Sequence, residues 1–130
     1  MEMTFPATVD ALDRIVAYVT AKAEADGVNP TLIQRLEVAL EEAVVNVCRH
    51  AYAGRSGEIR VRLCSGKCRF GVELEDCGPA FNPLTADTPD TTAGLNERAV
   101  GGLGVLLIRR LVDDVSYRRE GDRNILTLAV

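Results

Sequence analysis

A glutamate and an asparagine four residues apart are the first side chains in this sequence whose types and spacing suggest chemistry. Glu42 and Asn46 lie in a stretch from about Pro30 to His50 whose apolar residues recur at helical spacing. At about 100° per residue, Glu41 lies on the solvent side of this helix, while Glu42 and Asn46 step toward the opposite side. A carboxylate and an amide among apolar neighbours need a cation or hydrogen-bond partners. The pair therefore predicts either a cation site or a structural contact with a neighbouring loop.

A glycine-rich segment, Gly101-Gly102-Leu103-Gly104, precedes another apolar helical run. Backbone N–H groups there can approach an anion closely, and the N-terminus of a helix carries partial positive charge. No Gly-Lys-Ser/Thr follows, so the segment is not a Walker A loop, and it lacks the Gly-x-Gly-x-x-Gly spacing of a dinucleotide fingerprint. It predicts a phosphate-binding loop or, alternatively, a flexible hinge before a helix.

A third polar segment, Asp76-Cys77-Gly78-Pro79, ends an expected strand. A fixed carboxylate can accept a hydrogen bond from an exocyclic amino group, and a glycine leaves room for a flat base. Because aspartate and glycine are also common turn residues, the segment taken alone is equally consistent with a simple turn.

The elements that position these residues follow from hydrophobic periodicity and turn residues. In chain order we expect an extended start around Thr4–Ala7, helices over Val9–Asp26 and Pro30–His50, a hairpin from Glu58 to Asp76 turning at Ser65-Gly66-Lys67, a helix over Leu103–Leu111, and a hairpin of Asp114–Arg119 with Ile125–Val130. From Cys77 to Val100 no period holds, which is typical of functional lids or disordered segments. This order predicts an α+β fold, a two-layer α/β sandwich with a mixed, mostly antiparallel sheet and helices on one face.

Length and composition limit the class of protein. With 130 residues and 47% hydrophobic content, we expect a single domain over residues 1–130. The net charge is −4, and no stretch gathers basic residues with aromatic ones, so direct binding to nucleic acid is not expected. No apolar run is long enough to cross a membrane and the start does not resemble a leader, which predicts a cytoplasmic protein without a membrane partner.

The cysteines and the single histidine do not suggest a metal site. The four cysteines contain no Cys-x-x-Cys pair, which favours reduced thiols over zinc or disulfides. Two of them, Cys64 and Cys68, flank the expected hairpin turn and could face each other across the strands. His50 is expected to be a structural histidine near the site.

In combination and in order, the three polar segments resemble the nucleotide-binding boxes of the GHKL ATPase superfamily, the histidine-kinase-like ATPases. The matching segments are Glu42-x-x-x-Asn46, Asp76-x-Gly78, the long loop and Gly102-x-Gly104. The branch that is most similar is that of the anti-sigma-factor serine kinases, which carry a histidine and a tyrosine after the asparagine and a Phe-x-Pro after the aspartate. The corresponding residues here are His50, Tyr52 and Phe81-Asn82-Pro83.

This resemblance implies a Bergerat-type fold that binds ATP with Mg²⁺. It implies that Asn46 helps to hold the metal and that Glu42 orients or deprotonates the attacking hydroxyl. It also implies that Asp76 reads adenine and that Gly78 lets the base approach. The remaining implied contacts are those of Gly101, Gly102 and Gly104 with the phosphates, of Arg98 on a lid from about residue 82 to residue 100, and of Thr127 near adenine.

Two positions depart from the family pattern. Ala80 stands where many members have a second glycine, and Asn82 stands where an aspartate is common. Because alanine restricts the backbone more than glycine does, these departures predict a stiffer lid hinge with nucleotide binding retained.

The function that the resemblance implies is a regulatory serine/threonine kinase. It would transfer the ATP γ-phosphoryl group to a small STAS-type anti-anti-sigma partner, sequester a sigma factor and so act in transcription regulation. The alternative is a module in which nucleotide only gates protein binding, without phosphotransfer. Homodimerisation is left open by the sequence.

Overall fold

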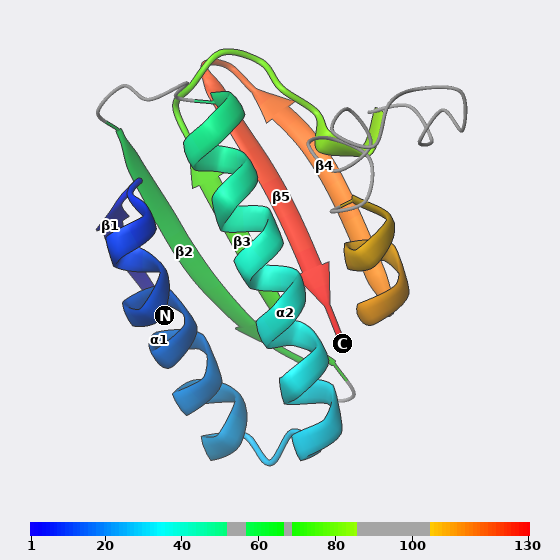
Figure 1. Ribbon diagram of the computed structural model, residues 1–130. Coiled ribbons are helices and arrows are strands. Elements are labelled where there is room, and N and C mark those ends of the chain that lie inside the picture. Colours follow the sequence, from blue (N-terminus) through cyan, green and yellow to red (C-terminus); the bar gives the residue numbers. More distant parts are fainter. Residues whose placement is uncertain (52–56, 67–68, 86–104) are drawn as a thin grey trace.

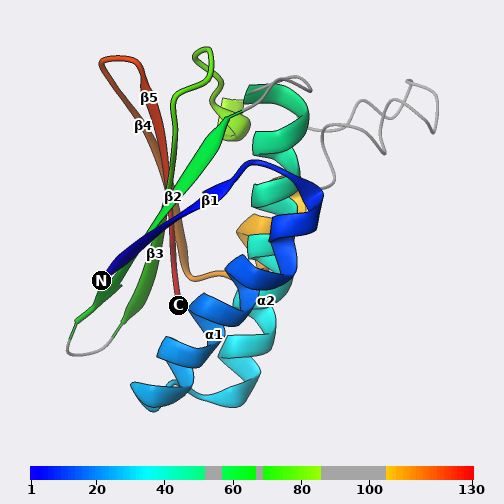
Figure 2. The same ribbon diagram turned by 90° about the vertical axis from the view of Figure 1, so that its left-hand side faces the viewer.

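The fold has two layers, a five-stranded sheet and a layer of helices that covers one of its faces (Figures 1 and 2). The structure, a computed structural model, describes residues 1–51, 57–66, 69–85 and 105–130. The strands are β1 (Glu2–Pro6), β2 (Glu58–Ser65), β3 (Phe70–Asp76), β4 (Asp114–Glu120) and β5 (Arg123–Ala129). Their order across the sheet is β1-β2-β3-β5-β4, and every pair is antiparallel. The predicted α+β sandwich with helices on one face is confirmed, although the described strands form a wholly antiparallel sheet rather than a mixed one.

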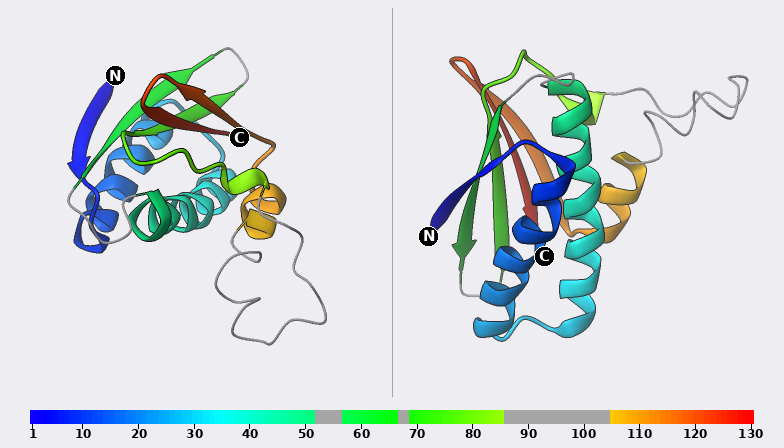
Figure 3. Two further views of the ribbon diagram at one scale, coloured as in Figure 1. Left: turned by 90° about the horizontal axis from the view of Figure 1, so that it is seen from above. Right: turned by 60° about the vertical axis from the view of Figure 1, so that its left-hand side comes forward.

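Two long helices form most of the second layer. Helix α1 spans Leu12–Ala25 after a short 3-10 turn, and α2 spans Pro30–Asn46. The start of α2 is fixed by Asn29, whose Oδ1 accepts a hydrogen bond from the Thr31 N–H at 2.8 Å, and by proline at the first helical position. A shorter helix over residues 105–111 lies on the other side of α2 from α1 (Figure 3).

The core lies between the sheet and the helices because side chains alternate between the two faces of each strand. One face of β2, β3 and β5 presents fully or nearly fully buried residues to the helices. The largest fully buried side chains on this face and on the two long helices are Ile59, Val61, Val72, Leu74 and Leu128 with Ile15, Val19, Leu36, Leu40 and Val44.

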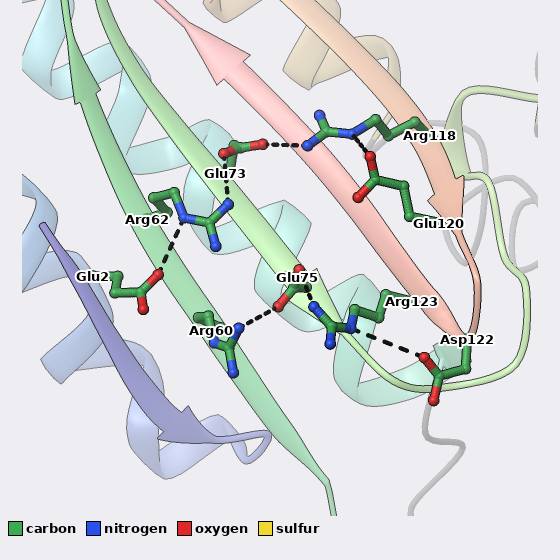
Figure 4. A network of polar contacts seen from close by, with 9 residues as sticks. All are labelled: Glu2, Arg60, Arg62, Glu73, Glu75, Arg118, Glu120, Asp122 and Arg123. Atoms are coloured by element: carbon green, nitrogen blue, oxygen red, sulfur yellow. Dashed lines mark hydrogen bonds and ion pairs between the residues drawn. The ribbon is translucent and has the colours of Figure 1, made fainter.

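The opposite face of the sheet carries ion pairs (Figure 4). Glu73 on β3 binds Arg118 of β4 at 2.9 Å and Arg62 of β2 at 3.3 Å. Glu75 binds Arg60 at 3.1 Å. Because this face is covered by paired charges, the polar site has to be sought on the helix side or at the ends of the strands.

The last turn of the second helix is of a type that was not predicted. The chain is helical as far as the expected end at about His50, but the α-helix ends at Asn46 and the chain continues as a π-helix over Val47–Ala51. The Val47 N–H lies within reach of both the Ala43 and the Val44 carbonyl, where the helix changes from α to π. Such single-turn π segments occur often at functional sites. Hydrophobic periodicity could not detect this change because the apolar pattern is continuous through it.

Candidate functional site

The Asp76 carboxylate, at the end of β3, is fixed by its own turn and by the neighbouring strand. The residue is only 5% exposed. Its Oδ1 accepts hydrogen bonds from the Gly78 N–H at 2.9 Å and from Asn124 Nδ2 at 2.8 Å. Among the described residues no donor bonds to Oδ2, so this oxygen remains available to a ligand.

Burial raises the pKa of Asp76 above its ordinary value. The hydrogen bonds from Asn124 and Gly78 and the charge of Arg119 oppose this rise, while the charge of Glu75 adds to it. A buried carboxyl with a raised pKa and a free acceptor oxygen is a candidate for ligand recognition rather than for a purely structural turn.

Asn124 on β5 is a site residue that the sequence interpretation missed. Its Nδ2 donates to Asp76 and, at 2.9 Å, to the Pro79 carbonyl, while its Oδ1 accepts from the Phe81 N–H at 3.1 Å and from the Tyr117 hydroxyl at 2.5 Å. The available signal was an asparagine directly before the apolar residues Ile125 and Leu126, because an amide that is buried with them must find partners.

Arg119 on β4 supports the same turn. Its Nη1 donates to the Gly78 carbonyl at 2.9 Å. This guanidinium therefore anchors the turn after Asp76, whereas the adjacent Arg118 points to the open face of the sheet and binds Glu73.

Asn46 lines the same pocket as Asp76. This small pocket lies between the carboxyl end of α2 and the ends of β3 and β5, and its other walls are largely apolar. The residues that line it are Ala43, Asn46, Val47, Asp76, Phe81, Pro83, Tyr117, Asn124 and Leu126. The fold thus brings two of the predicted site residues together from distant parts of the chain.

Glu42 lies one turn before Asn46 and is half-buried, whereas Glu41 is exposed as predicted. Glu42 does not line the pocket with Asn46 and Asp76. Val38, one turn earlier still, is 39% exposed, so Glu42 lies at the edge of the buried face of α2 rather than opposite the solvent. The core face is centred on residues such as Leu36, Leu40 and Val44, so the predicted step of Glu42 away from the solvent side takes it only to the edge of that face.

The segment after this turn repeats the contact between Asp76 and Gly78, in which a side-chain oxygen accepts a hydrogen bond from the backbone N–H two residues later. Asn82 Oδ1 accepts from the Leu84 N–H at 2.9 Å and opens a 3-10 turn over Pro83–Thr85. Asparagine and aspartate both make this contact, so Asn82 performs locally the role that an aspartate would have. Arg109, on the helix over residues 105–111, donates to the Leu84 carbonyl at 3.4 Å.

Thr127 does not join this group. It pairs with Glu73 across β3 and β5, while its neighbours Leu126 and Leu128 are in the core. Since side chains alternate along a strand, Thr127 lies on the sheet face away from the helices. The predicted contact of Thr127 with adenine is therefore not supported, and Asn124 is the polar residue of β5 that faces the pocket.

Several predicted residues lie outside the part of the chain that the structure describes. These are Arg98, Gly101, Gly102 and Gly104 with most of the expected lid, and also Tyr52 and Cys68. The backbone of His50 is within the π-helix, but its side chain is not described.

Among the described cysteines, Cys48, Cys64 and Cys77 form no disulfide, and burial raises the pKa of the Cys48 thiol. Within residues 1–51, 57–66, 69–85 and 105–130 no group of three or more histidine, cysteine, aspartate or glutamate side chains could hold a metal ion. No described helix has both the length and the apolar character needed to span a membrane.

The family model for the histidine kinase-like ATPase domain matches residues 5–130. The chain belongs to this family. Two curated relatives are the serine-protein kinase RsbW of Bacillus pumilus, 31% identical over 125 residues (91% of this chain and 77% of that protein), and RsbW of Listeria monocytogenes serovar 1/2a, 34% identical over 101 residues (73% and 64%). These relatives confirm the resemblance to the anti-sigma serine kinase branch of the GHKL superfamily.

A third relative is the serine/threonine-protein kinase BtrW of Bordetella bronchiseptica, 30% identical over 94 residues, covering 72% of this chain and 66% of that protein. This chain therefore spans slightly less than two thirds of the length of BtrW and of the Listeria RsbW. A chain in the solved structure of the SiaB-SiaC complex from Pseudomonas aeruginosa shares the fold, with a TM-score of 0.58, 16% identity, and coverage of 100% of this chain and 88% of that chain.

Proposed function

We propose that this protein binds ATP with Mg²⁺ and transfers the γ-phosphoryl group to a serine or threonine of a small STAS-type anti-anti-sigma partner, and that it also sequesters a sigma factor. One observation carries the proposal. In a chain of the histidine kinase-like ATPase family, Asp76 and Asn46 line one pocket, and Asp76 keeps a free acceptor oxygen there. The names of the relatives, serine-protein kinase and serine/threonine-protein kinase, supply the class of reaction.

The residues that line the pocket suit the base of ATP in their chemical character. Asp76 Oδ2 would accept a hydrogen bond from the 6-amino group of adenine, as a fixed carboxylate can. Val47, Pro83 and Leu126 offer apolar contacts to a flat ring. The turn at Gly78 is held by Asp76 at the end of β3 and by Arg119 on β4. The Asp76 carboxylate would therefore need little rearrangement when a nucleotide binds.

Magnesium would arrive with the nucleotide rather than occupy a site made only of protein. Mg²⁺ typically uses one or two protein oxygens together with water and substrate phosphates. A single amide oxygen, that of Asn46, fits this pattern, as does the lack of an acidic cluster in the described part of the chain. When bound, the ion would neutralise negative charge on the phosphates.

Glu42 would act on the attacking hydroxyl. Four residues before Asn46 on α2, it lies on the neighbouring part of the same helix surface, outside the base pocket. In the described part of the chain no cation or hydrogen-bond donor engages its carboxylate. A half-buried carboxylate in this state can accept the proton of a partner hydroxyl while positioning and charge neutralisation provide most of the rate.

The direct test is transfer of label from [γ-³²P]ATP to a STAS-type partner from the same cells, with a serine- and threonine-free variant of the partner as control. Label on a serine or threonine of the partner supports the kinase. ATP-dependent binding of the partner without label would instead support the nucleotide-gated binding module. A thermal shift with Mg-ATP tests binding by itself, because a ligand selective for the folded state raises its stability.

A further inference from the structure

Asn124 is a buried amide that connects three segments around the pocket. It is 4% exposed and bonds to the Asp76 carboxylate, to the turn over residues 79–81 and to Tyr117 on β4. Its two Nδ2 hydrogens are directed at Asp76 and the Pro79 carbonyl, and both acceptor positions of its Oδ1 are filled. Its orientation is therefore determined from all sides.

This orientation decides which Asp76 oxygen remains available. Oδ1 accepts both hydrogen bonds, one from Asn124 on β5 at 2.8 Å and one from the Gly78 N–H in the turn after β3 at 2.9 Å. A carboxylate held through one oxygen by two donors cannot rotate without losing both bonds. Oδ2 is consequently the oxygen that a ligand in the pocket would meet.

We propose that Asn124 is the positioning residue that sets the selectivity of this site for a 6-aminopurine, by holding Asp76 so that Oδ2 receives the amino group. The inference rests on the proposed function, since it takes ATP as the ligand. It deepens that function because it moves the source of base selectivity from Asp76 alone to the pair of Asp76 and Asn124.

A merely structural role for Asn124 would have a different consequence. If the amide only held the turn together, its removal would loosen the whole pocket and weaken every purine nucleotide alike. If it orients the acceptor, its removal weakens ligands that carry the 6-amino group and has little effect on those that lack it. The ratio of two affinities separates the two roles.

The experiment compares ATP with purine riboside triphosphate, which has hydrogen in place of the 6-amino group, by calorimetric titration in the presence of Mg²⁺. The variants are Asn124→Asp, which keeps the size and the acceptor oxygens but removes the donor to Asp76, and Asn124→Ala. Ser116→Ala, exposed on the neighbouring strand β4, is the matched control. Thermal unfolding without nucleotide verifies that each variant folds.

The preference of the parent protein for ATP should decrease by about tenfold or more in both Asn124 variants, as expected for the loss of one oriented hydrogen bond, and should be unchanged in the control. In an Asp76→Asn background, Asn124→Ala should no longer change this ratio, because the two residues act as a unit. If Asn124→Asp does not fold, the comparison can be made with Asn124→Ala alone.

Equal weakening of both nucleotides by the Asn124 variants, or an undiminished effect in the Asp76→Asn background, would overturn the inference while leaving ATP binding in place. Failure of the parent protein to bind either nucleotide would overturn the proposed function instead, and the inference with it. Nucleotide binding by the parent protein, measured without any substitution, tells these two failures apart.

Discussion

Asn46, the last residue of α2, lines the same pocket as Asp76 at the end of β3. An amide oxygen and a carboxylate thus lie at two places around one cavity and come from different layers of the fold. This arrangement suits a ligand with a base at one end and anionic groups at the other. Asn46 and Asp76 should therefore have separate, measurable roles in binding.

Asn46→Ala should weaken Mg-ATP binding because it removes the only protein oxygen that we assign to the metal. We expect a loss of about 10- to 100-fold in affinity, measured by calorimetry with Mg²⁺. In the presence of EDTA the loss should be much smaller. Gln34→Ala, at an exposed amide earlier on α2, serves as control. An equal loss with and without Mg²⁺ would contradict the metal assignment.

Glu42→Gln should slow phosphotransfer by about 10²–10⁴-fold while ATP affinity is largely retained, since a general base acts mainly in the transition state. Single-turnover transfer to the partner measures the rate, and calorimetry measures the binding. Glu41→Gln, one residue earlier and exposed, is the matched control. An unchanged transfer rate in Glu42→Gln would exclude this role for Glu42.

Periodicity predicted the layers of this fold, because helices and strands bury their apolar residues at characteristic spacings. The hairpins, both long helices and the exposure of Glu41 all follow from that rule. Periodicity does not report how a helix ends. The change to a π-helix after Asn46 depends on backbone hydrogen bonding that leaves no signal in the hydrophobic pattern.

The candidate site was predicted in part. Ordered motifs identified Asp76 and Asn46, which the fold brings to one pocket. Choosing between Thr127 and Asn124 required the register of β5, since a shift of an odd number of residues reverses the face that a side chain occupies. Resemblance to a family pattern does not fix that register, and the buried amide was overlooked for this reason.

The raised pKa of Asp76 has a consequence for stability. Because the folded-state pKa lies above the unfolded value of 3.8, the native protein binds more protons between these two values, and its stability falls as pH rises through the folded-state pKa. The carboxylate therefore destabilises the nucleotide-free protein near neutral pH.

Asp76→Asn should thus be more stable than the parent protein at about pH 7, and this advantage should shrink as the pH falls through the raised folded-state pKa of Asp76. Urea unfolding without nucleotide over this range measures it. The same variant should lose the thermal shift with Mg-ATP, as expected for a group kept for function at a cost in stability. A stability difference that does not vary with pH would contradict the proposed titration.

The charged network on the open face of the sheet gives a prediction that does not involve the pocket. Glu73, whose side chain is 13% exposed, binds Arg62 on the neighbouring strand β2 and Arg118 on β4, which lies beyond β5, whereas Glu120, 60% exposed, binds Arg118 (Figure 4). An isolated exposed pair contributes little, but a shielded carboxylate that joins two arginines contributes more. Glu73→Gln should therefore lower the urea midpoint clearly more than Glu120→Gln does.

The salt dependence provides the control for this comparison. Screening weakens exposed pairs, so high salt should reduce the small effect of Glu120→Gln to nothing and leave most of the effect of Glu73→Gln. ATP binding should be unchanged in both variants because the network lies on the face away from the pocket. Equal midpoints for the two variants at low salt would show that the shielding of Glu73 has no energetic consequence, and that the open face is held by the sheet alone.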